Sequence, residues 1–289
     1  MANTISLKRR IGSVKNTKQI TKAMELVAAS KMRRAQDAAN KSRAYRQTAY
    51  SLLRRLSAVT DVEIHPLFRR RDVKTRLYVV ITSNRGLAGA YNSNILRLLS
   101  RSIISDHKKG VKTQIIAIGK QAANFVRRLE GVEMIAAYVS FEDQPTATDI
   151  RPILNTIVDK YQGEETDGVS LLYTDFKSNL VQESTVLKLL PAVLDDVQEH
   201  SPLEAATLEP SVQVVLDNVA ERLLEVQIWQ ALLESVASEH SMRMMAMKSA
   251  TDNASDLIDD LTLEFNTARQ AAITQELAEI SGGAEAMAS

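Results

Sequence analysis

The sequence contains no cysteine among its 289 residues. This absence excludes disulfide bonds, thiol catalysis, cysteine-ligated metal sites and a regulatory dithiol. The four histidines are scattered and form no His-x-x-x-His pair, so we expect no metal site. Aromatic residues make up only 4% of the chain, which suits a helix-rich architecture better than a β-sandwich.

Long apolar runs are also missing. No stretch of about 18 apolar residues occurs in the sequence, so no membrane-spanning helix is predicted. The first residues, MANTISLKRRIGSVKN, lack the apolar centre of a secretion signal. We therefore expect the protein not to be exported.

Glycine and proline are absent from two long stretches, residues 13–65 and 211–281. Both stretches are rich in Ala, Leu, Glu, Arg and Met, which favour helices. They predict one long helix within residues 1–60 and a second within residues 209–285. At about 1.5 Å per residue the second helix would extend roughly 105 Å. A compact domain of this chain length cannot enclose it, so it must project.

Apolar residues recur in alternating steps of four and three along Val212–Ala272, where fifteen of eighteen such positions are apolar. A repeat of 3.5 residues held over this length predicts a left-handed coiled coil. Ten of fifteen positions fit the same stepping along Leu7–Leu56. The pattern fails around Lys18–Glu25. There we expect the apolar stripe to shift to Ile20, Met24 and Val27.

The net charge of +1 hides opposite charges at the two ends of the chain. Residues 1–60 contain fourteen Lys and Arg against two acidic residues, whereas residues 209–289 contain fourteen acidic residues against four Lys and Arg. An acidic partner within the chain argues against nucleic-acid binding by the basic segment. The two helices are expected to pair antiparallel, with buried apolar seams supplying most of the stabilisation.

Connectivity also predicts a register for this pair. If pairing starts near Leu56 and Val212, Met24 lies near Arg243 and Met244. The last helix is longer than the first, so everything past about Phe265 should stand alone. That segment is still apolar, and an exposed single helix of this kind needs a socket in another protein. Its apolar residues are Phe265, Ala268, Ala271, Ala272, Ile273, Leu277 and Ile280.

Residues 75–195 alternate between strand and helix patterns. Strands are predicted at 76–82, 111–119, 131–139, 168–176 and 183–191, and helices at 92–109, 120–129 and 148–162. This alternation predicts a doubly wound, Rossmann-like α/β domain with a largely parallel sheet. The fold class is therefore α/β, with a long antiparallel coiled coil of N- and C-terminal helices attached.

The loop SNRGLAGAYN (83–92) follows the first predicted strand and raises the question of a nucleotide site. Its only glycines are Gly86 and Gly89. A dinucleotide fingerprint needs a third glycine and an acidic residue after the second strand, and a P-loop needs Lys followed by Ser or Thr. We interpret the loop as a tight strand-to-helix turn. An uncharacterised ligand and a true nucleotide site remain the alternatives.

Three long motifs carry a resemblance to a known family. They are IGSVKNTKQITKAMELVAASKMRRAQ (11–36), SNRGLAGAYN (83–92) and AMKSATDNASDLIDDLTLEFNTARQAAITQELAEISGGAEA (246–286). With the layout of helices and middle domain, they make the chain resemble the γ subunit of F-type ATP synthase from end to end. The family often has Asp where this chain has Asn84, and it often differs at Ala88 and Ala90. These departures leave the resemblance intact.

The resemblance implies a non-catalytic rotor shaft that couples proton-driven rotation of a c ring to conformational change at β catalytic sites. Implied partners are the hexamer of α and β subunits, the ε subunit and the c ring, with one copy of this chain per complex. No cofactor, metal, nucleotide or nucleic acid is implied. The expected location is the cytoplasmic face of a bacterial plasma membrane, bound peripherally.

The resemblance also implies functional residues. Contacts with β are implied for Lys22, Met24, Lys31, Arg33, Arg34 and Arg243. A coupling segment near the end of the shaft is implied for Arg269, Gln270, Thr274 and Glu276. The region around Glu209 is implied to contact ε and the c ring. Two rival interpretations are a nucleotide- or metabolite-binding protein tethered by a coiled coil, and a basic coiled-coil nucleic-acid binder.

Overall fold

The computed structural model describes residues 2–57, 65–139, 145–192 and 211–288. The chain forms two compact units. One consists of residues 1–28 and 243–289, and the other of residues 29–242. In the described residues, no helix is long and apolar enough to cross a bilayer.

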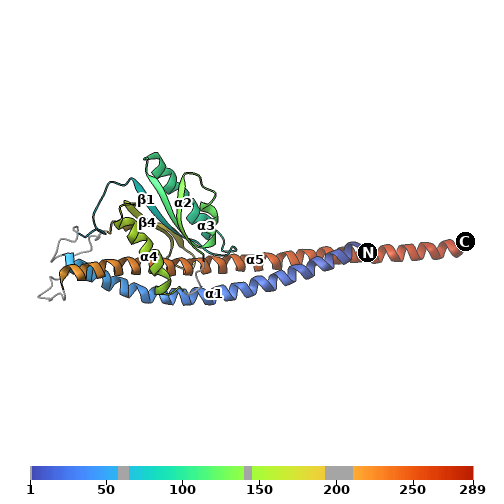
Figure 1. Cartoon of the computed structure of the whole chain (residues 1–289). Coiled ribbons are helices and arrows are strands. Elements are labelled where there is room, and N and C mark those ends of the chain that lie inside the picture. Colours follow the sequence, from blue (N-terminus) through green and yellow to red (C-terminus); the bar gives the residue numbers. More distant parts are fainter. Residues whose placement is uncertain (1, 58–64, 140–144, 193–210, 289) are drawn as a thin grey trace. The chain divides into compact units, whose positions relative to one another are not determined.

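Two long helices contribute to both units (Figure 1). Helix α1 runs over Ala2–Ser57 and has 56 residues, and helix α5 runs over Val212–Ala288 and has 77 residues. At about 1.5 Å per residue they extend roughly 84 and 115 Å. Most of each helix lies where the sequence lacks glycine and proline. Helix α1 also includes Gly12 near its start, and α5 includes Gly282 and Gly283 in its last turns.

The second unit contains a five-stranded sheet in the order β3-β2-β1-β4-β5. Strands β1 to β4 pair in parallel, and β5 pairs antiparallel with β4. The predicted α/β class and the largely parallel sheet are therefore confirmed. The strands are β1 Thr75–Ile81, β2 Lys112–Ile118, β3 Val132–Tyr138, β4 Gly168–Phe176 and β5 Gln182–Leu190.

Helices cover both faces of this sheet. Helices α2 (Tyr91–Lys108) and α3 (Lys120–Val126) pack on one face, where Tyr78 and Val80 of β1 point. Helix α4 (Ala147–Gln162) and the first part of α5 pack on the other face, where Leu77, Val79 and Ile81 point. Alternate residues of a strand point to opposite faces, so an apolar run such as β1 must be buried on both sides.

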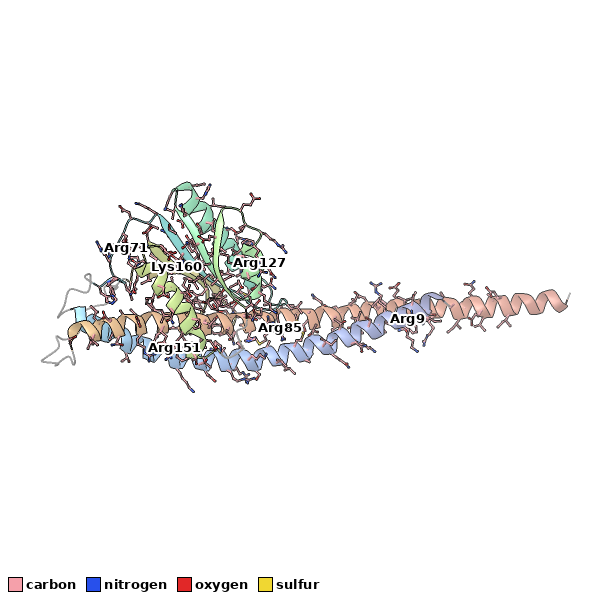
Figure 2. The ribbon with its side chains drawn as sticks, viewed as in Figure 1. Arg9, Arg71, Arg85, Arg127, Arg151 and Lys160 are labelled. Carbon is pink, nitrogen blue, oxygen red and sulfur yellow. The ribbon has the colours of Figure 1, made fainter. Side chains whose placement is uncertain are left out.

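The segment before β1 is fastened to the end of α4. The Arg71 guanidinium lies 4.6 Å from the centre of the Tyr161 ring, and its Nη2 donates to the Tyr161 carbonyl oxygen at 3.0 Å. The Tyr161 hydroxyl donates to the Arg69 carbonyl oxygen at 2.9 Å. Figure 2 shows Arg71 and Lys160 at this edge of the domain. These bonds hold the segment 69–71 to the end of α4, although the bonded residues are 90 and 92 positions apart in the chain.

A buried histidine joins the same segment to α5. The His65 side chain is 5% exposed, its Nδ1 accepts from the Leu67 amide at 3.2 Å, and its Nε2 faces Asp217 Oδ1 at 3.1 Å. Burial lowers the pKa of His65, and the nearby carboxylates of Asp217 and Glu221 oppose this effect. Because Nδ1 accepts a hydrogen bond, the folded protein favours the neutral imidazole.

We expect His65 to stabilise the fold less as the pH falls. Its folded pKa is lowered, so its contribution is present above the unfolded pKa of about 6.5 and is lost as pH falls through the folded pKa. His65→Gln should cost about 1–2 kcal/mol at pH near 8, because a buried polar network is disturbed. The cost should shrink at pH near 5.5. Urea unfolding of the full chain at both pH values checks this, and a cost that grows on acidification would contradict it.

Candidate functional site

The loop after β1 uses its polar groups to cap a helix. The first amides of α3 are bonded by groups at the end of β1 and in the loop that follows, rather than left open. The bonds run from Lys120 N to Asn84 Oδ1 at 3.0 Å, from Gln121 N to Ser83 O at 3.2 Å, and from Ala122 N to Thr82 Oγ1 at 2.8 Å. In nucleotide-binding folds the amides at a helix N-terminus bind phosphate. Here the α3 amides are already occupied.

The entry to α2 is also closed by internal bonds. Asn92 accepts from the Ser83 amide at 3.0 Å, and its Nδ2 donates to Ser83 Oγ at 2.7 Å. The backbone turns through two positive φ angles, 61° at Leu87 and 53° at Gly89. These bonds give the loop a structural role as a strand-to-helix corner. Within the described residues, no group of three or more His, Asp or Glu side chains could hold a metal ion.

The first unit is an antiparallel helix pair with polar groups in its seam. The Thr21 and Thr251 hydroxyl oxygens are 2.8 Å apart, and Lys18 Nζ donates to Ser255 Oγ. The buried positions of α5 in this unit include Met247, Thr251, Ala254 and Leu261, which follow the predicted steps of four and three. A seam of this kind holds two helices in one register, because each polar group must meet its partner.

The predicted shift of the α1 stripe is wrong. Thr21 is buried and Lys18 is half-buried, while Ile20 and Val27 are 60% and 55% exposed. The seam therefore keeps its period through the polar positions. Hydrogen bonds across the pair satisfy these side chains, so their burial does not carry the full cost of an unpaired polar group. Apolar side chains are left on the outside of α1 instead.

The predicted register is wrong by about one helical turn. Since Thr21 lies opposite Thr251, antiparallel counting places Met24 level with residue 248 rather than with Arg243. At about 1.5 Å per residue, Arg243 lies roughly 7 Å along the axis from that level. Periodicity identifies which face of a helix is buried. A slide of four residues along the same seam keeps that face buried, so the pattern could not distinguish the two registers.

The residues implied to contact β differ in their exposure. Lys22 is exposed and forms an ion pair with Glu25 at 3.0 Å. Met24 and Arg243 are half-buried in the first unit. The second unit holds the remaining three. Of these, Lys31 is half-buried, whereas Arg33 and Arg34 are exposed.

Helix α5 extends beyond the start of α1, as predicted, but its unpaired part begins further along the chain than predicted. Phe265, Ala268 and Ala272 are half-buried, and residues 273–281 are exposed. The single helix therefore starts about two turns beyond Phe265, partly because the register shift brings the start of α1 further along α5. Ile273 and Leu277 are 48% and 61% exposed. This segment presents apolar side chains outward.

The residues implied to couple near the end of the shaft are all exposed. Arg269 and Gln270 lie on the last paired turns, and Thr274 and Glu276 lie on the single helix. The structure thus groups these four along about two turns of α5, separated from Arg243 by roughly 39 Å of helix. Glu209 lies outside the described residues.

Comparison with known proteins gives the family. The family model described as ATP synthase matches residues 3–287. The chain is 40% identical to the ATP synthase gamma chain of Pelotomaculum thermopropionicum, over 99% of this chain and 100% of that protein. It is 41% identical to the ATP synthase gamma chain of Herpetosiphon aurantiacus, over 99% of both.

Solved structures agree. A chain in the central stalk and c-ring structure of the Tetrahymena thermophila mitochondrial ATP synthase is 25% identical with a TM-score of 0.61, covering 80% of this chain and 99% of that chain. The fold also matches a chain in the OSCP/F1/c-ring structure of Euglena gracilis mitochondrial ATP synthase, with a TM-score of 0.69 at 17% identity, over 99% and 95% of the two chains. This chain therefore belongs to the family of ATP synthase gamma chains.

Proposed function

We propose that this chain is the central rotor shaft of an F-type ATP synthase. It couples proton-driven rotation of the c ring to conformational change at the β catalytic sites, and in reverse it couples ATP hydrolysis to proton pumping. The observation that carries the proposal is the match over 99% of the chain to ATP synthase gamma chains at 40% identity. We assign residues 1–60 and 209–285 to the shaft and residues 75–195 to a foot.

The first unit has the asymmetry that such a shaft needs. On α1 an exposed basic group comprises Lys8, Arg9, Arg10 and Lys15. On α5 an exposed acidic group comprises Asp252, Asp256, Asp259, Asp260 and Glu264. Figure 2 shows Arg9 on α1. Equivalent β subunits around this rod would each meet a different charge, and only contacts that differ between states can shift a site from one state to another.

In this proposal β is contacted by a group of shaft residues, which are Lys22, Met24, Lys31, Arg33 and Arg243. The second group, Arg269, Gln270, Thr274 and Glu276, sits in the upper part of the α/β hexamer. The apolar single helix of α5 supports this second placement, since it would be a liability in water. The region around Glu209 contacts ε and the c ring.

The chain itself is non-catalytic in this proposal. The occupied amides at the α3 N-terminus support this, because they leave the loop of the foot without the phosphate-binding groups of a nucleotide site. One copy serves each complex, at the cytoplasmic face of the bacterial plasma membrane and peripheral to it.

A reversible tether tests rotation. Because the chain has no cysteine, Lys22→Cys introduces a thiol that is unique within it. In the assembled complex, a cleavable thiol-to-amine cross-linker should join this position to β and abolish most ATP hydrolysis. Cleaving the linker should restore hydrolysis, because the shaft can turn again.

The control is the same variant modified with a one-ended reagent of equal length, which adds the bulk without the tether and should keep its activity. Subunit analysis should find one copy of this chain per α/β hexamer. Full hydrolysis by complexes that are quantitatively tethered to β would show that the chain does not rotate against β.

A further inference from the structure

Three serines of α5 face the sheet at intervals of three residues. Ser235, Ser238 and Ser241 are each 0% exposed. Serine is neutral to unfavourable inside a helix, because its hydroxyl competes for nearby backbone groups. Here each hydroxyl bonds instead to β4 or to the turn that follows it. We call these three residues the serine clamp.

Two of the serines continue a ladder that β1 leaves unfinished. The β1–β4 pairing ends at Val80 and Leu172, whereas β4 continues to Phe176. Thr174 lies in this extension and is 1% exposed. Its amide donates to Ser235 Oγ at 3.2 Å, and its carbonyl oxygen accepts from Ser238 Oγ at 3.2 Å. Helix α5 thus satisfies the two backbone groups that a neighbouring strand would otherwise satisfy.

The third serine fastens the turn between β4 and β5. Ser241 Oγ donates to the Asn179 carbonyl oxygen at 3.0 Å, and Gln182 Nε2 donates to Ser241 Oγ at 3.2 Å. Beside these bonds, Phe176 packs against Ala35 of α1 and Ala237 of α5. Small side chains on both helices let the end of β4 approach closely. The end of β4 therefore contacts both long helices, α1 and α5, within the second unit.

We propose that the serine clamp is the joint that carries torque between the foot and the shaft helix. This inference rests on the proposed rotor function. Between Leu216 and Leu232 the side chains of α5 that join the core against the sheet are apolar, although Glu225, Gln227 and Gln230 are also buried in this stretch. Apolar contact is non-directional. It resists separation more than it resists sliding or turning. Hydrogen bonds need aligned partners at about 3 Å, so the clamp fixes α5 both along and around its axis.

The position of the clamp suits this role. Its three serines span roughly 9 Å of α5, just after the part of the helix that packs in the apolar core of the foot. Torque applied to the sheet reaches α5 through β4 at this level. The His65–Asp217 contact joins α5 to the segment before β1, near the start of the helix, so the clamp supplies the directional contacts between α5 and the sheet itself. Without them the sheet would lag behind the shaft under load, and the stored rotation would be lost to slippage.

The test uses the double variant Ser235→Ala and Ser238→Ala in the assembled complex. Amide hydrogen exchange in the segment containing Thr174 should become at least about tenfold faster, because its buried amide loses its acceptor. ATP hydrolysis should persist. ATP-driven proton pumping in inverted vesicles should fall as the opposing proton gradient grows, so that protons pumped per ATP drop under load. A purely structural weakening would lower assembly and leave this ratio unchanged.

The matched control is Ser249→Ala, the same change at an exposed position of the same helix, which should pump like the parent. If the double variant does not assemble, Ser241→Ala replaces it, with a smaller loss of pumping under load. Parental pumping per ATP under load in the assembled clamp variant would overturn the inference. If parent and control also fail to couple hydrolysis to pumping, the rotor function itself fails.

Discussion

Replacing Gly119 with alanine is expected to destabilise the α/β domain severely. Gly119 has a φ of 95°, and a Cβ there would lie 2.2 Å from the Thr82 carbonyl oxygen and 2.8 Å from Thr82 Oγ1. Both distances are far inside van der Waals contact, and neither group can retreat without breaking the cap on α3. We expect a loss of at least about 3 kcal/mol, a large part of a stability of about 5–15 kcal/mol.

Two other glycines distinguish steric close approach from backbone strain as the cause of the lost stability. Gly86→Ala meets no heavy atom within 4 Å and should change stability by no more than about 0.5 kcal/mol. Gly110→Ala also has open space but a φ of 72°, so it should cost about 1 kcal/mol through backbone strain alone. Urea unfolding of the full chain, followed by fluorescence of its single tryptophan, Trp229, measures all three. An equal cost at Gly119 and Gly110 would show that close approach is not the reason for Gly119.

Gly119 also explains why the first loop looks like a nucleotide site. The chain needs glycine where the end of β2 passes the end of β1, and Thr82 and Asn84 then reach the first amides of α3. Nucleotide-binding folds use glycine at a similar corner to admit a phosphate. A glycine at this corner therefore indicates only that two backbone segments approach closely. Whether a phosphate or the protein's own side chains bind the α3 amides depends on the neighbouring residues, here Thr82 and Asn84.

The strands were predictable because each is a clear run of apolar residues that ends at turn-forming residues. The predicted strand 168–176 coincides with β4, and the others agree within one or two residues at each end. Buried apolar runs bounded by glycine and charged turns admit few alternatives. The antiparallel direction of β5 was not predicted, although the short connection after Phe176 permits only a hairpin.

The buried face of the shaft helix α5 was predictable from the sequence, but the register in which α1 and α5 pair was not. Hydrophobic periodicity fixed the buried side of α5, from Met247 to Leu261. It failed for α1 at Lys18 and Thr21, whose burial depends on partners in the other helix. A one-dimensional pattern contains no information about such pairing across helices. The serine clamp escaped notice for the same reason, since its signal is only serine at every third position of a helix otherwise rich in Ala and Leu.

Asp106→Ala is expected to destabilise the domain by about 3 kcal/mol, because it breaks a buried charge network. Asp106 on α2 is 1% exposed. Its Oδ1 accepts from Arg76 Nη1 at 3.1 Å, and its Oδ2 accepts from the Tyr78 hydroxyl at 2.6 Å. Removing the carboxylate leaves the Tyr78 hydroxyl buried and the Arg76 charge without this partner. Trp229 fluorescence in urea measures the change in the free energy of unfolding.

The titration of Tyr78 distinguishes this network from simple loss of packing. Burial raises the pKa of Tyr78 to about 12, and its bond to Asp106 adds to the effect. The folded pKa exceeds the unfolded value of about 10, so the stabilisation is complete below pH 10 and is lost as pH rises toward 12. In Asp106→Ala the pKa of Tyr78 should fall, as seen by tyrosinate absorbance against Tyr78→Phe. Asp159→Ala, exposed on α4, should leave both stability and titration unchanged. A destabilised Asp106→Ala with an unshifted Tyr78 titration would assign the loss to packing rather than to the charge network.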